Sequence, residues 1–269
     1  MSDVFLREFY MSASVYKAKY IVGMKVNATS YAHVIDSVLT WASVGQSSYV
    51  CISNVHMTME CHHSQSFKQI VNEADLVTPD GMPLVWMMRW LGVREQQRVR
   101  GPSLLPLLCE AAALHHLKVG FYGSTDSVLQ QLVERLRCDF PGLEVAFSYS
   151  PPFRELSVTE DDDIVNNINS SGAGILFVGL GCPKQEIWMA KHRGQIMMPM
   201  LGVGAAFDIC SGTKSESPLW LQKLGLEWVY RFILEPRRLW KRYLKYNPHF
   251  IWLAFVQLVN RKISPSNSE

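Results

Sequence analysis

The stretch Gly174–Arg193 reads GILFVGLGCPKQEIWMAKHR. It opens with a short apolar run, Gly174–Val178, which passes through a glycine-containing turn into a plausible amphipathic helix, Lys184–Arg193. A run of apolar residues without alternation is typical of a strand that is buried on both faces of a sheet. A strand–turn–helix unit of this kind predicts a parallel sheet with covering helices, provided that the pattern recurs.

The pattern does recur along the first 210 residues. Further apolar runs predict strands at Tyr20–Val26, Tyr49–Ser53, Leu76–Thr78, Lys118–Tyr122, Glu144–Tyr149 and Pro199–Val203. The helical patterns between them are Tyr31–Ala42, Ser66–Asn72, Pro102–His115, Ser127–Cys138 and Asp161–Asn169. This alternation predicts an α/β fold, a Rossmann-like and mostly parallel sheet with helices on both faces. Ligands of such sheets bind beyond the carboxyl ends of the strands.

The pattern changes near residue 210. From Pro218 onward the chain shows only helical patterns, which Pro236 and Pro248 punctuate. Residues 211–269 hold ten Lys/Arg and four Asp/Glu, a balance of +6, whereas residues 1–210 have a balance of −4. We therefore expect a Rossmann-like domain at 1–210 and a basic helical appendage at 211–269, with an anionic partner for the appendage.

The composition excludes a disordered chain, because 48% of the residues are hydrophobic and 19% are charged. The six cysteines are scattered and form no C-x-x-C pair, so free thiols in a reducing cytoplasm are expected. Met1–Tyr10 does not read as a secretory signal, and no run of roughly 18 apolar residues predicts a spanning helix. The polar tail Ser264–Glu269 is expected to fray.

Two glycine-containing turns follow predicted strands, GFYGST at Gly120–Thr125 and GLGCPKQE at Gly179–Glu186. Backbone N–H groups at such helix starts bind phosphate, and a lysine there can neutralise a diphosphate. The alternative is a pair of ordinary turns with helix caps, Thr125 among them. Neither turn contains G-x-G-x-x-G or the P-loop lysine, so neither common nucleotide fingerprint is present. The candidate binding residues here are Gly123, Ser124, Gly179, Gly181, Lys184 and Gln185.

Charged side chains stand at two further element ends. Asp80 lies in TPDGMP, Thr78–Pro83, where a carboxylate at the end of a strand could take a proton from a reacting hydroxyl. The alternative is a plain turn, since Pro-Asp-Gly is a strong turn sequence. Arg98 and Arg100 lie in RVRGP before a helix, and guanidinium groups suit phosphate oxygens. A solvated pair of charges is the alternative for the arginines.

Metal ligation is not expected from this sequence. Asp161 and Asp163 form a D-x-D pair that could hold Mg²⁺, but Thr159 resembles an N-cap, and acidic residues in a first helical turn favour the helix dipole. The histidines and cysteines, among them the adjacent Cys61, His62 and His63, lack the spacing of a zinc site.

The C-terminal region combines basic, aromatic and aliphatic residues. Leu221–Tyr246 is rich in Lys, Arg, Trp and Tyr, and His249–Val259 reads HFIWLAFVQLV, which is too short to span a bilayer. This mixture suits a helix that lies in an anionic membrane interface. The alternative is a helix packed on the body with a solvated basic face. Nucleic acid is not an expected partner, because long apolar stretches are unneeded there.

Short motifs along Lys25–Tyr246 occur in an order that resembles the WecG/TagA/CpsF glycosyltransferase family. Each motif is weak alone, but the ordered set is highly specific. The matching pieces are Asn54, Ala74–Asp75, Asp80–Gly81, Arg98 with Gly101, Gly123, Gly179–Glu186, Gly202–Gly204, Asp208 with Gly212, Leu224–Arg231 and Glu235–Arg238.

The resemblance implies an inverting glycosyltransferase with a Rossmann-like catalytic domain. It implies transfer of a hexose, often N-acetylmannosamine, from a UDP-sugar to an undecaprenyl-diphosphate-linked acceptor in cell-surface polysaccharide assembly. No metal or other cofactor is implied. The appendage would touch the cytoplasmic membrane surface and supply arginines to the site, so the protein would be peripheral on the inner face of the bacterial cell membrane.

The resemblance also implies roles for individual residues. Asp80 would be the general base, and Asn54 would help to place a sugar. Arg231, Arg237 and Arg238 would stabilise the leaving diphosphate, which gains charge in the transition state. The substrate-binding residues would be Gly81, Arg98, Gly101, Gly123, Ser124, Gly179, Gly181, Lys184, Gln185 and Gly204.

The sequence departs from the family pattern at three positions. Ile52 stands where the family usually has threonine, and Arg100 stands where it often has a small residue. Glu216, two residues before Pro218, stands where a basic residue is usual. Arg100 suggests a different acceptor or donor, and the contacts of the loop around Glu216 are not carried over from the family.

Other functions stay open at this point. A UDP-glucose-type hexosyltransferase for exopolysaccharide is the alternative within the same class of enzyme. A Rossmann-type oxidoreductase or methyltransferase is a second alternative, although the missing G-x-G-x-x-G counts against it. A non-catalytic peripheral membrane protein that organises polysaccharide assembly is the third.

Overall fold

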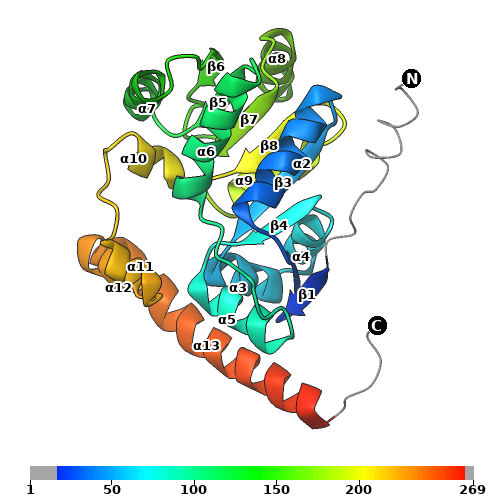
Figure 1. The fold of residues 1–269 in the computed structure, drawn as a ribbon, viewed down its shortest axis with the longest axis vertical. Coiled ribbons are helices and arrows are strands. Elements are labelled where there is room, and N and C mark those ends of the chain that lie inside the picture. Colours follow the sequence, from blue (N-terminus) through cyan, green and yellow to red (C-terminus); the bar gives the residue numbers. More distant parts are fainter. Residues whose placement is uncertain (1–16, 264–269) are drawn as a thin grey trace.

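The computed structural model describes residues 17–263 of the 269-residue chain. The expectations for Met1–Tyr10 and for the tail Ser264–Glu269 fall outside these described residues. A central sheet carries helices on both sides, and one long helix runs along the lower end of the molecule in Figure 1. The prediction of an α/β fold is therefore confirmed.

Within residues 17–263, six parallel strands form the central sheet in the order β4-β3-β8-β7-β5-β6. Their bounds are β3 Ser48–Ser53, β4 Leu76–Pro79, β5 Val119–Gly123, β6 Val145–Tyr149, β7 Ile175–Gly179 and β8 Pro199–Gly202. The predicted Rossmann-like parallel sheet is confirmed. Because all six strands run the same way, their carboxyl ends meet at one edge of the sheet, where ligands bind in such folds.

Successive residues of the inner strands point to opposite faces of the sheet, and each face has its own apolar core. Val50 and Ile52 of β3 belong to one core, while Tyr49 and Cys51 belong to the other. The first core is covered by α2 Tyr31–Ser43, α6 Gly101–Leu114, α7 Asp126–Asp139 and α10 Ala206–Cys210. The second is covered by α3 Val55–His63, α4 Gln65–Asn72, α5 Met82–Trp90, α8 Val158–Ser170 and α9 Lys184–Lys191.

The predicted strand Tyr20–Val26 is wrong. The chain forms an antiparallel hairpin there, with β1 at Ala18–Ile21 and β2 at Met24–Asn27 in a separate two-stranded sheet. Val22 and Gly23 take positive φ values of 51° and 84° at the turn. Two central residues with positive φ make the kind of tight turn that joins hairpin strands, so the apolar run is folded back on itself.

Three helices, α3, α5 and the five-residue α10, were not predicted. Helices α3 and α5 begin immediately after a strand, so a short polar or glycine-containing turn hides the start of each. Asn54 caps α3 by accepting a hydrogen bond from the Met57 N–H, and Gly81 with the following proline begins α5. The start of α8 also differs from prediction, because Ser157 and not Thr159 is its N-cap. Thr125 is the N-cap of α7, as the alternative interpretation of its turn expected.

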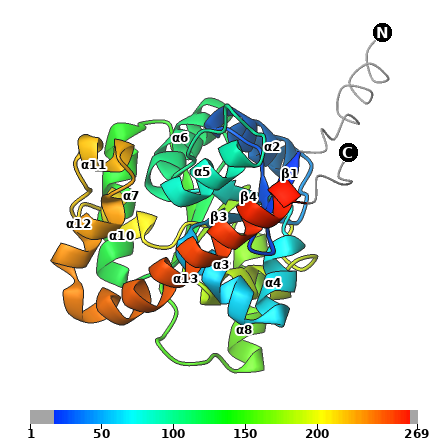
Figure 2. The ribbon, with the colours of Figure 1, turned by 90° about the horizontal axis from the view of Figure 1, so that it is seen from below.

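The segment after residue 210 is helical, as predicted. It contains α11 Leu219–Lys223, α12 Glu227–Leu234 and α13 Pro236–Ile263. Pro236 begins α13, but Pro248 lies inside this helix and does not end it. Buried Phe250 and Ala254, which follow Pro248, hold the later part of the helix against the core. Figure 2, a view from below, shows α13 crossing in front of α3, which it contacts.

Polar and aromatic contacts fix α13 on the body. Tyr246 donates a hydrogen bond to the Glu60 carboxylate at 2.7 Å, and its ring stacks on His56 and His63 with centroid distances of 5.6 Å. Further along the helix, the Gln257 amide accepts from the Val22 N–H at 2.9 Å. No helix within residues 17–263 is both long enough and apolar enough to cross a membrane.

Candidate active site

The carboxyl edge of the sheet gathers most of the predicted site residues. Asp80 directly follows β4, and its backbone N–H donates to the carbonyl of Ser53 at the end of β3 at 2.8 Å. Asn54 follows the same β3 strand. Since neighbouring parallel strands end together, the two side chains start from adjacent points of the edge. The other predicted residues at this edge are Gly81, Gly123, Ser124, Gly179, Gly181 and Gly204.

The Asn54 side chain has a structural contact of its own. Its Oδ1 accepts a hydrogen bond from the Met57 N–H at 3.2 Å, as an N-cap of α3. Gly81 lies against this residue, since a Cβ on Gly81 would be 3.6 Å from the Asn54 Cα. The Asn54 side chain therefore fixes the start of α3 at the carboxyl edge of the sheet.

Arg98 reaches across to Asp80 from the loop that precedes α6. Its Nε donates to the Asp80 carbonyl, and its Nη2 lies 3.3 Å from Asp80 Oδ1. Both side chains are largely enclosed, with exposed fractions of 15% for Arg98 and 22% for Asp80. Burial raises the pKa of Asp80, because a carboxylate loses solvation there, while the charge of Arg98 opposes the increase.

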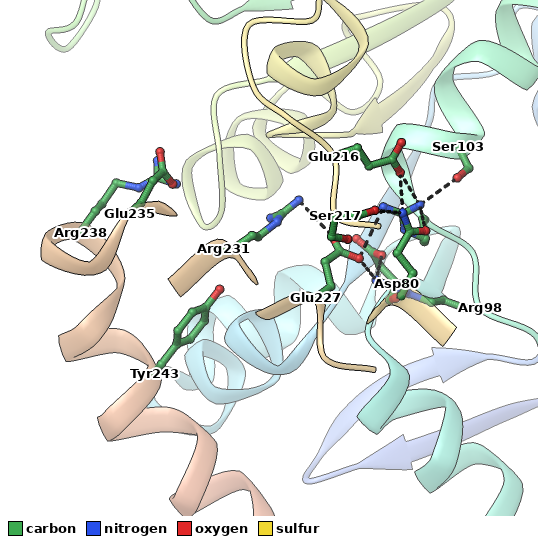
Figure 3. Close-up of polar contacts among 12 residues, drawn as sticks. Asp80, Arg98, Ser103, Glu216, Ser217, Glu227, Arg231, Glu235, Arg238 and Tyr243 are labelled. Carbon is green, nitrogen blue, oxygen red and sulfur yellow. Dashed lines mark hydrogen bonds and ion pairs between the residues drawn. The ribbon is translucent and has the colours of Figure 1, made fainter. Parts of the chain in front are cut away.

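A carboxylate from the C-terminal segment completes this group (Figure 3). Glu227, the first residue of α12, lies 2.7 Å from Arg98 Nη2 through its Oε2. The same oxygen lies 3.4 Å from Arg100 Nη2, and Oε1 lies 3.3 Å from Arg231 Nη2. We call Asp80, Arg98, Arg100, Glu216, Glu227 and Arg231 the ion-pair cluster.

Arg100 joins the body to the loop before α11. Its Nη1 lies 2.6 Å from Glu216 Oε1 and 2.6 Å from Gln222 Oε1, and the side chain is 8% exposed. Arg100 and Glu216 are two of the positions at which the sequence departs from the family pattern. The structure joins them in one ion pair, so the two departures are parts of a single contact.

The three arginines expected to act on a leaving diphosphate lie in different places. Arg231 belongs to the ion-pair cluster through Glu227. Arg238 pairs with Glu235, and Figure 3 shows this pair on the far side of Arg231 from Asp80. Arg237 is exposed on the first turn of α13. The structure therefore brings one of the three next to Asp80.

The two glycine-containing turns meet at the middle of the edge. Gly123 and Gly179 pair at the ends of β5 and β7, and the Ser124 N–H donates to the Gly179 carbonyl at 3.2 Å. Gly123 has a φ of 122°, and a Cβ there would lie 2.6 Å from the Gly179 carbonyl carbon. A Cβ on Gly179 would overlap the ring of Phe207. Close backbone packing at the strand ends therefore requires glycine at both positions.

Gln185 lies beneath the end of β8 and is 4% exposed. Its Oε1 accepts from the Gly181 N–H at 3.1 Å, and its Nε2 donates to Glu186 Oε1 at 2.7 Å. A Cβ on Gly202 would come within 2.9 Å of the Gln185 amide nitrogen, and one on Gly204 within 3.3 Å of its oxygen. The glycines of GVG thus leave room for this amide, which in turn fixes the turn at Gly181.

Glu186 is fully buried behind Gln185. Burial raises its pKa to about 7, because the ionised form loses solvation, although the hydrogen bond from Gln185 opposes the increase. Its second oxygen has no hydrogen-bond partner among the described residues. A carboxyl group in such surroundings favours its protonated form at neutral and acidic pH.

The remaining predicted residues have simpler surroundings. Lys184 is exposed in the first turn of α9. Gly101 begins α6, and a Cβ there would lie 3.3 Å from the Val203 carbonyl, so glycine allows α6 to approach the end of β8. Asp161 pairs with Lys191 and lies 3.1 Å from His192 Nε2. Residues 17–263 contain no group of three His, Cys, Asp or Glu side chains that could hold a metal ion.

Two elements of the site were missed at the sequence level. Glu227 lies in the LGLEWVYR motif, but its pairing with Arg98 joins distant parts of the chain and leaves no local pattern. Glu186 was not predicted as a site residue, and its burial follows from the packing of α9 against the sheet. Neither could be assigned without knowing how α12 and α9 meet the sheet.

Known proteins are similar to this chain over most of its length. A family model described as the glycosyl transferase WecG/TagA/CpsF family matches residues 19–264. An N-acetylglucosaminyldiphosphoundecaprenol N-acetyl-beta-D-mannosaminyltransferase of Bacillus spizizenii is 29% identical over 206 residues, which cover 76% of this chain and 78% of the relative. A protein of the same name from Staphylococcus aureus (strain NCTC 8325 / PS 47) is 25% identical over 246 residues, covering 90% and 93%.

The burial of Glu186 makes stability depend on pH. Its pKa is raised on folding, so its contribution to stability is present below the ordinary value of 4.5 and is lost as pH rises through about 7. We expect the free energy of unfolding, measured with urea, to fall by roughly 2 kcal/mol between about pH 5.5 and about pH 8. Glu186→Gln, which keeps the oxygen that accepts from Gln185, should remove most of this decrease.

Glu134 provides the matched control for this prediction. It also accepts a hydrogen bond from a glutamine amide, Gln130 Nε2 at 3.0 Å, but it is exposed on α7. Glu134→Gln should leave the decrease in stability as it is in the wild type. An unchanged pH dependence in Glu186→Gln would show that the Glu186 carboxyl does not titrate as its burial requires.

Proposed function

Because the chain belongs to the WecG/TagA/CpsF family of glycosyltransferases, we propose that it transfers an N-acetylmannosamine-type hexose from a UDP-sugar to an undecaprenyl-diphosphate-linked acceptor. The printed names of the Bacillus spizizenii and Staphylococcus aureus relatives support this sugar and a lipid-linked N-acetylglucosamine acceptor. The chain covers most of the length of both relatives. The reaction would serve the assembly of a cell-surface polysaccharide.

In this proposal Asp80 is the general base. Its carboxylate takes the proton of an acceptor hydroxyl while that oxygen attacks the anomeric carbon of the donor. The bond between the anomeric carbon and the diphosphate oxygen breaks, and UDP leaves with the electron pair. Attack opposite to the leaving group inverts the anomeric centre. The observation that carries the assignment is the partly buried Asp80 at the carboxyl edge of the sheet, beside Arg98.

The leaving UDP gains negative charge, and fixed cations stabilise it best when they are already in place. Arg231 lies in the ion-pair cluster, Arg237 and Arg238 are exposed at the start of α13, and Lys184 is exposed on α9. The proposed donor site runs along the turns at Gly123 and Gly179. The Ser124 and Gly181 N–H groups already donate within these turns, so the starts of α7 and α9 would supply the donors for phosphate. Side-chain and backbone groups would therefore bind the diphosphate, and the proposal includes no metal or other cofactor.

We place residues 1–210 in a catalytic domain and residues 211–269 in an appendage that lies on the inner face of the cell membrane. Leu239, Phe250 and Ala254 face the body. A separate stripe of α13 exposes large apolar side chains beside Lys241 and Lys245. This stripe consists of Trp240, Leu244, Ile251 and Phe255. An apolar stripe bordered by lysines suits the interface of an anionic membrane.

The other functions make different demands on the site. A dinucleotide or S-adenosylmethionine enzyme needs a nucleotide turn of its own type, and G-x-G-x-x-G is missing from this sequence. A non-catalytic assembly protein has no need for a partly buried carboxylate at a ligand edge. A UDP-glucose-type donor would use the same base and cations, so the donor sugar has to be identified by substrate screening.

Asp80→Asn tests the base. The substitution keeps Oδ1 for Arg98 but removes the proton acceptor, so we expect a loss of roughly 10² to 10⁴ in the transfer rate from UDP-N-acetylmannosamine to a lipid-linked N-acetylglucosamine acceptor. UDP should still raise the thermal stability of the variant, as it does that of the wild type, because ligand binding favours the folded state. Asp36→Asn, an exposed change on α2, is the matched control and should keep the rate.

Two results would count against the proposal. An Asp80→Asn variant that binds UDP and keeps the full transfer rate would remove Asp80 as the base. A protein stabilised by NAD or S-adenosylmethionine, but not by UDP, would point to a different class of enzyme.

The membrane assignment has its own test. Leu244 and Ile251 are 68% and 66% exposed, so replacing both with glutamate removes apolar area and adds repulsion from anionic lipid. We expect sedimentation with phosphatidylglycerol vesicles to weaken roughly tenfold or more. Leu114→Glu on α6, at a site 76% exposed, is the control and should bind as the wild type does. Equal binding by the double variant and the wild type would exclude α13 as the membrane face.

A further inference from the structure

Glu227 is oriented against the general pattern of α12. Three large apolar residues of this helix are exposed, Trp228 at 42%, Ile233 at 69% and Leu234 at 54%. The Glu227 side chain is instead only 13% exposed. Burying a carboxylate while exposing aliphatic residues costs free energy unless the carboxylate is well paired. The inward position of Glu227 therefore depends on the cations that it meets.

The distances show that Glu227 and Asp80 share one guanidinium. Arg98 Nη2 lies 2.7 Å from Glu227 Oε2 but 3.3 Å from Asp80 Oδ1. Glu227 is thus the nearer partner of the cation that lies beside the proposed base. It also contacts Arg100 at 3.4 Å and Arg231 at 3.3 Å. Every arginine of the ion-pair cluster has Glu227 as a neighbour.

We propose that Glu227 is a positioning residue that keeps Asp80 a sufficiently strong base by sharing Arg98 with it and by balancing the charge of the surrounding arginines. The inference rests on the proposed function, in which Asp80 takes the proton of the acceptor hydroxyl. A carboxylate that is paired with an arginine of its own is a weak base, because proton uptake would break the pair. A second carboxylate on the same arginine reduces that penalty.

The charges around Asp80 act in the expected directions. Burial raises the pKa of Asp80, Arg98 lowers it, and Glu227 raises it, while Arg100 and Arg231 lower it. Burial alone would raise the pKa of Glu227, but Arg100, Arg98 and Arg231 hold it below its ordinary value. The three arginines therefore favour the ionised form of Glu227.

This arrangement gives the C-terminal segment a second effect on the reaction. Glu227 enters the site from α12, whereas Asp80 and Arg98 belong to loops of the α/β body. The base strength of Asp80 therefore depends on α12 being in place. A segment that only supplied cations to the leaving group would weaken the base, because each added arginine stabilises the ionised Asp80.

Glu227→Gln tests the inference through the pH dependence of kcat/KM for the lipid-linked acceptor. The substitution keeps the size of the side chain and removes one negative charge. Asp80 then loses its proton more easily, so the acid limb of the profile should move to lower pH by roughly half a unit to one unit. The plateau rate should fall roughly two- to tenfold, since a weaker base accepts the proton less readily. Glu227→Asp retains the charge and should keep the limb near its wild-type position.

Glu235→Gln is the matched control, because the Glu235 carboxylate belongs to the same C-terminal segment but pairs with Arg238 and Lys214, which lie outside the ion-pair cluster. Its acid limb should stay where the wild type has it. An unshifted limb in Glu227→Gln, or a shift to higher pH, would overturn the inference, even if the rate fell. Asp80→Asn distinguishes failure of the proposed function from failure of the inference about Glu227. If Asp80→Asn transfers at the wild-type rate, Asp80 is not the base. If Asp80→Asn is inactive but the acid limb of Glu227→Gln is unshifted, only the inference about Glu227 fails.

Discussion

The contact of Arg98 with two carboxylates is the constraint on which the rest of the site depends. Its guanidinium lies beside Asp80 at the sheet edge and beside Glu227 at the start of α12. Removing one partner from a buried ion pair is costly, because it leaves an uncompensated charge. The position of α12 and the charge around Asp80 are therefore linked. The pairs of Arg100 with Glu216 and of Arg231 with Glu227 extend the same link on either side.

The parallel sheet supplies the rigid half of this arrangement. The strand ends meet at one edge, and they carry Asp80, Gly123 and Gly179. The backbones of Gly123 and Gly179 lie so close together there that a side chain on Gly123 would not fit. Gln185 and the buried Glu186 hold the next turn from below. The segment from α11 to α13 supplies the other half, and Tyr246 against Glu60 and the neighbouring histidines fixes its far part on α3. In the proposed function, substrates bind between the two halves, so the reaction would need the relative position of the halves to be maintained.

Much of the fold could be predicted from local sequence patterns. Unbroken apolar runs such as Gly174–Val178 predict inner parallel strands, and all of the predicted strands except Tyr20–Val26 lie in the sheet. That exception depends on two positive φ values, which an apolar run does not reveal. At the site, the position of Asp80 followed from its place after a strand. Its pairing with Arg98 and Glu227 did not, because ion pairs between distant segments follow from tertiary packing and leave no periodic pattern. For the same reason the contact of Arg100 with Glu216 could not be predicted, although each residue separately differs from the family pattern.

Amide hydrogen exchange of α11 and α12 tests most directly whether the C-terminal segment is held on the body by these ion pairs. Helices as short as Leu219–Lys223 and Glu227–Leu234 are not stable alone, so any protection of their amides reports docking. The account predicts that these amides are protected in the wild-type protein without membrane. In the double variant Arg98→Gln/Arg100→Gln, the same amides should exchange roughly tenfold or more faster. The strand Ile175–Gly179 should keep its protection in both proteins. Unprotected α12 amides in the wild type, or equal protection in the double variant, would contradict it.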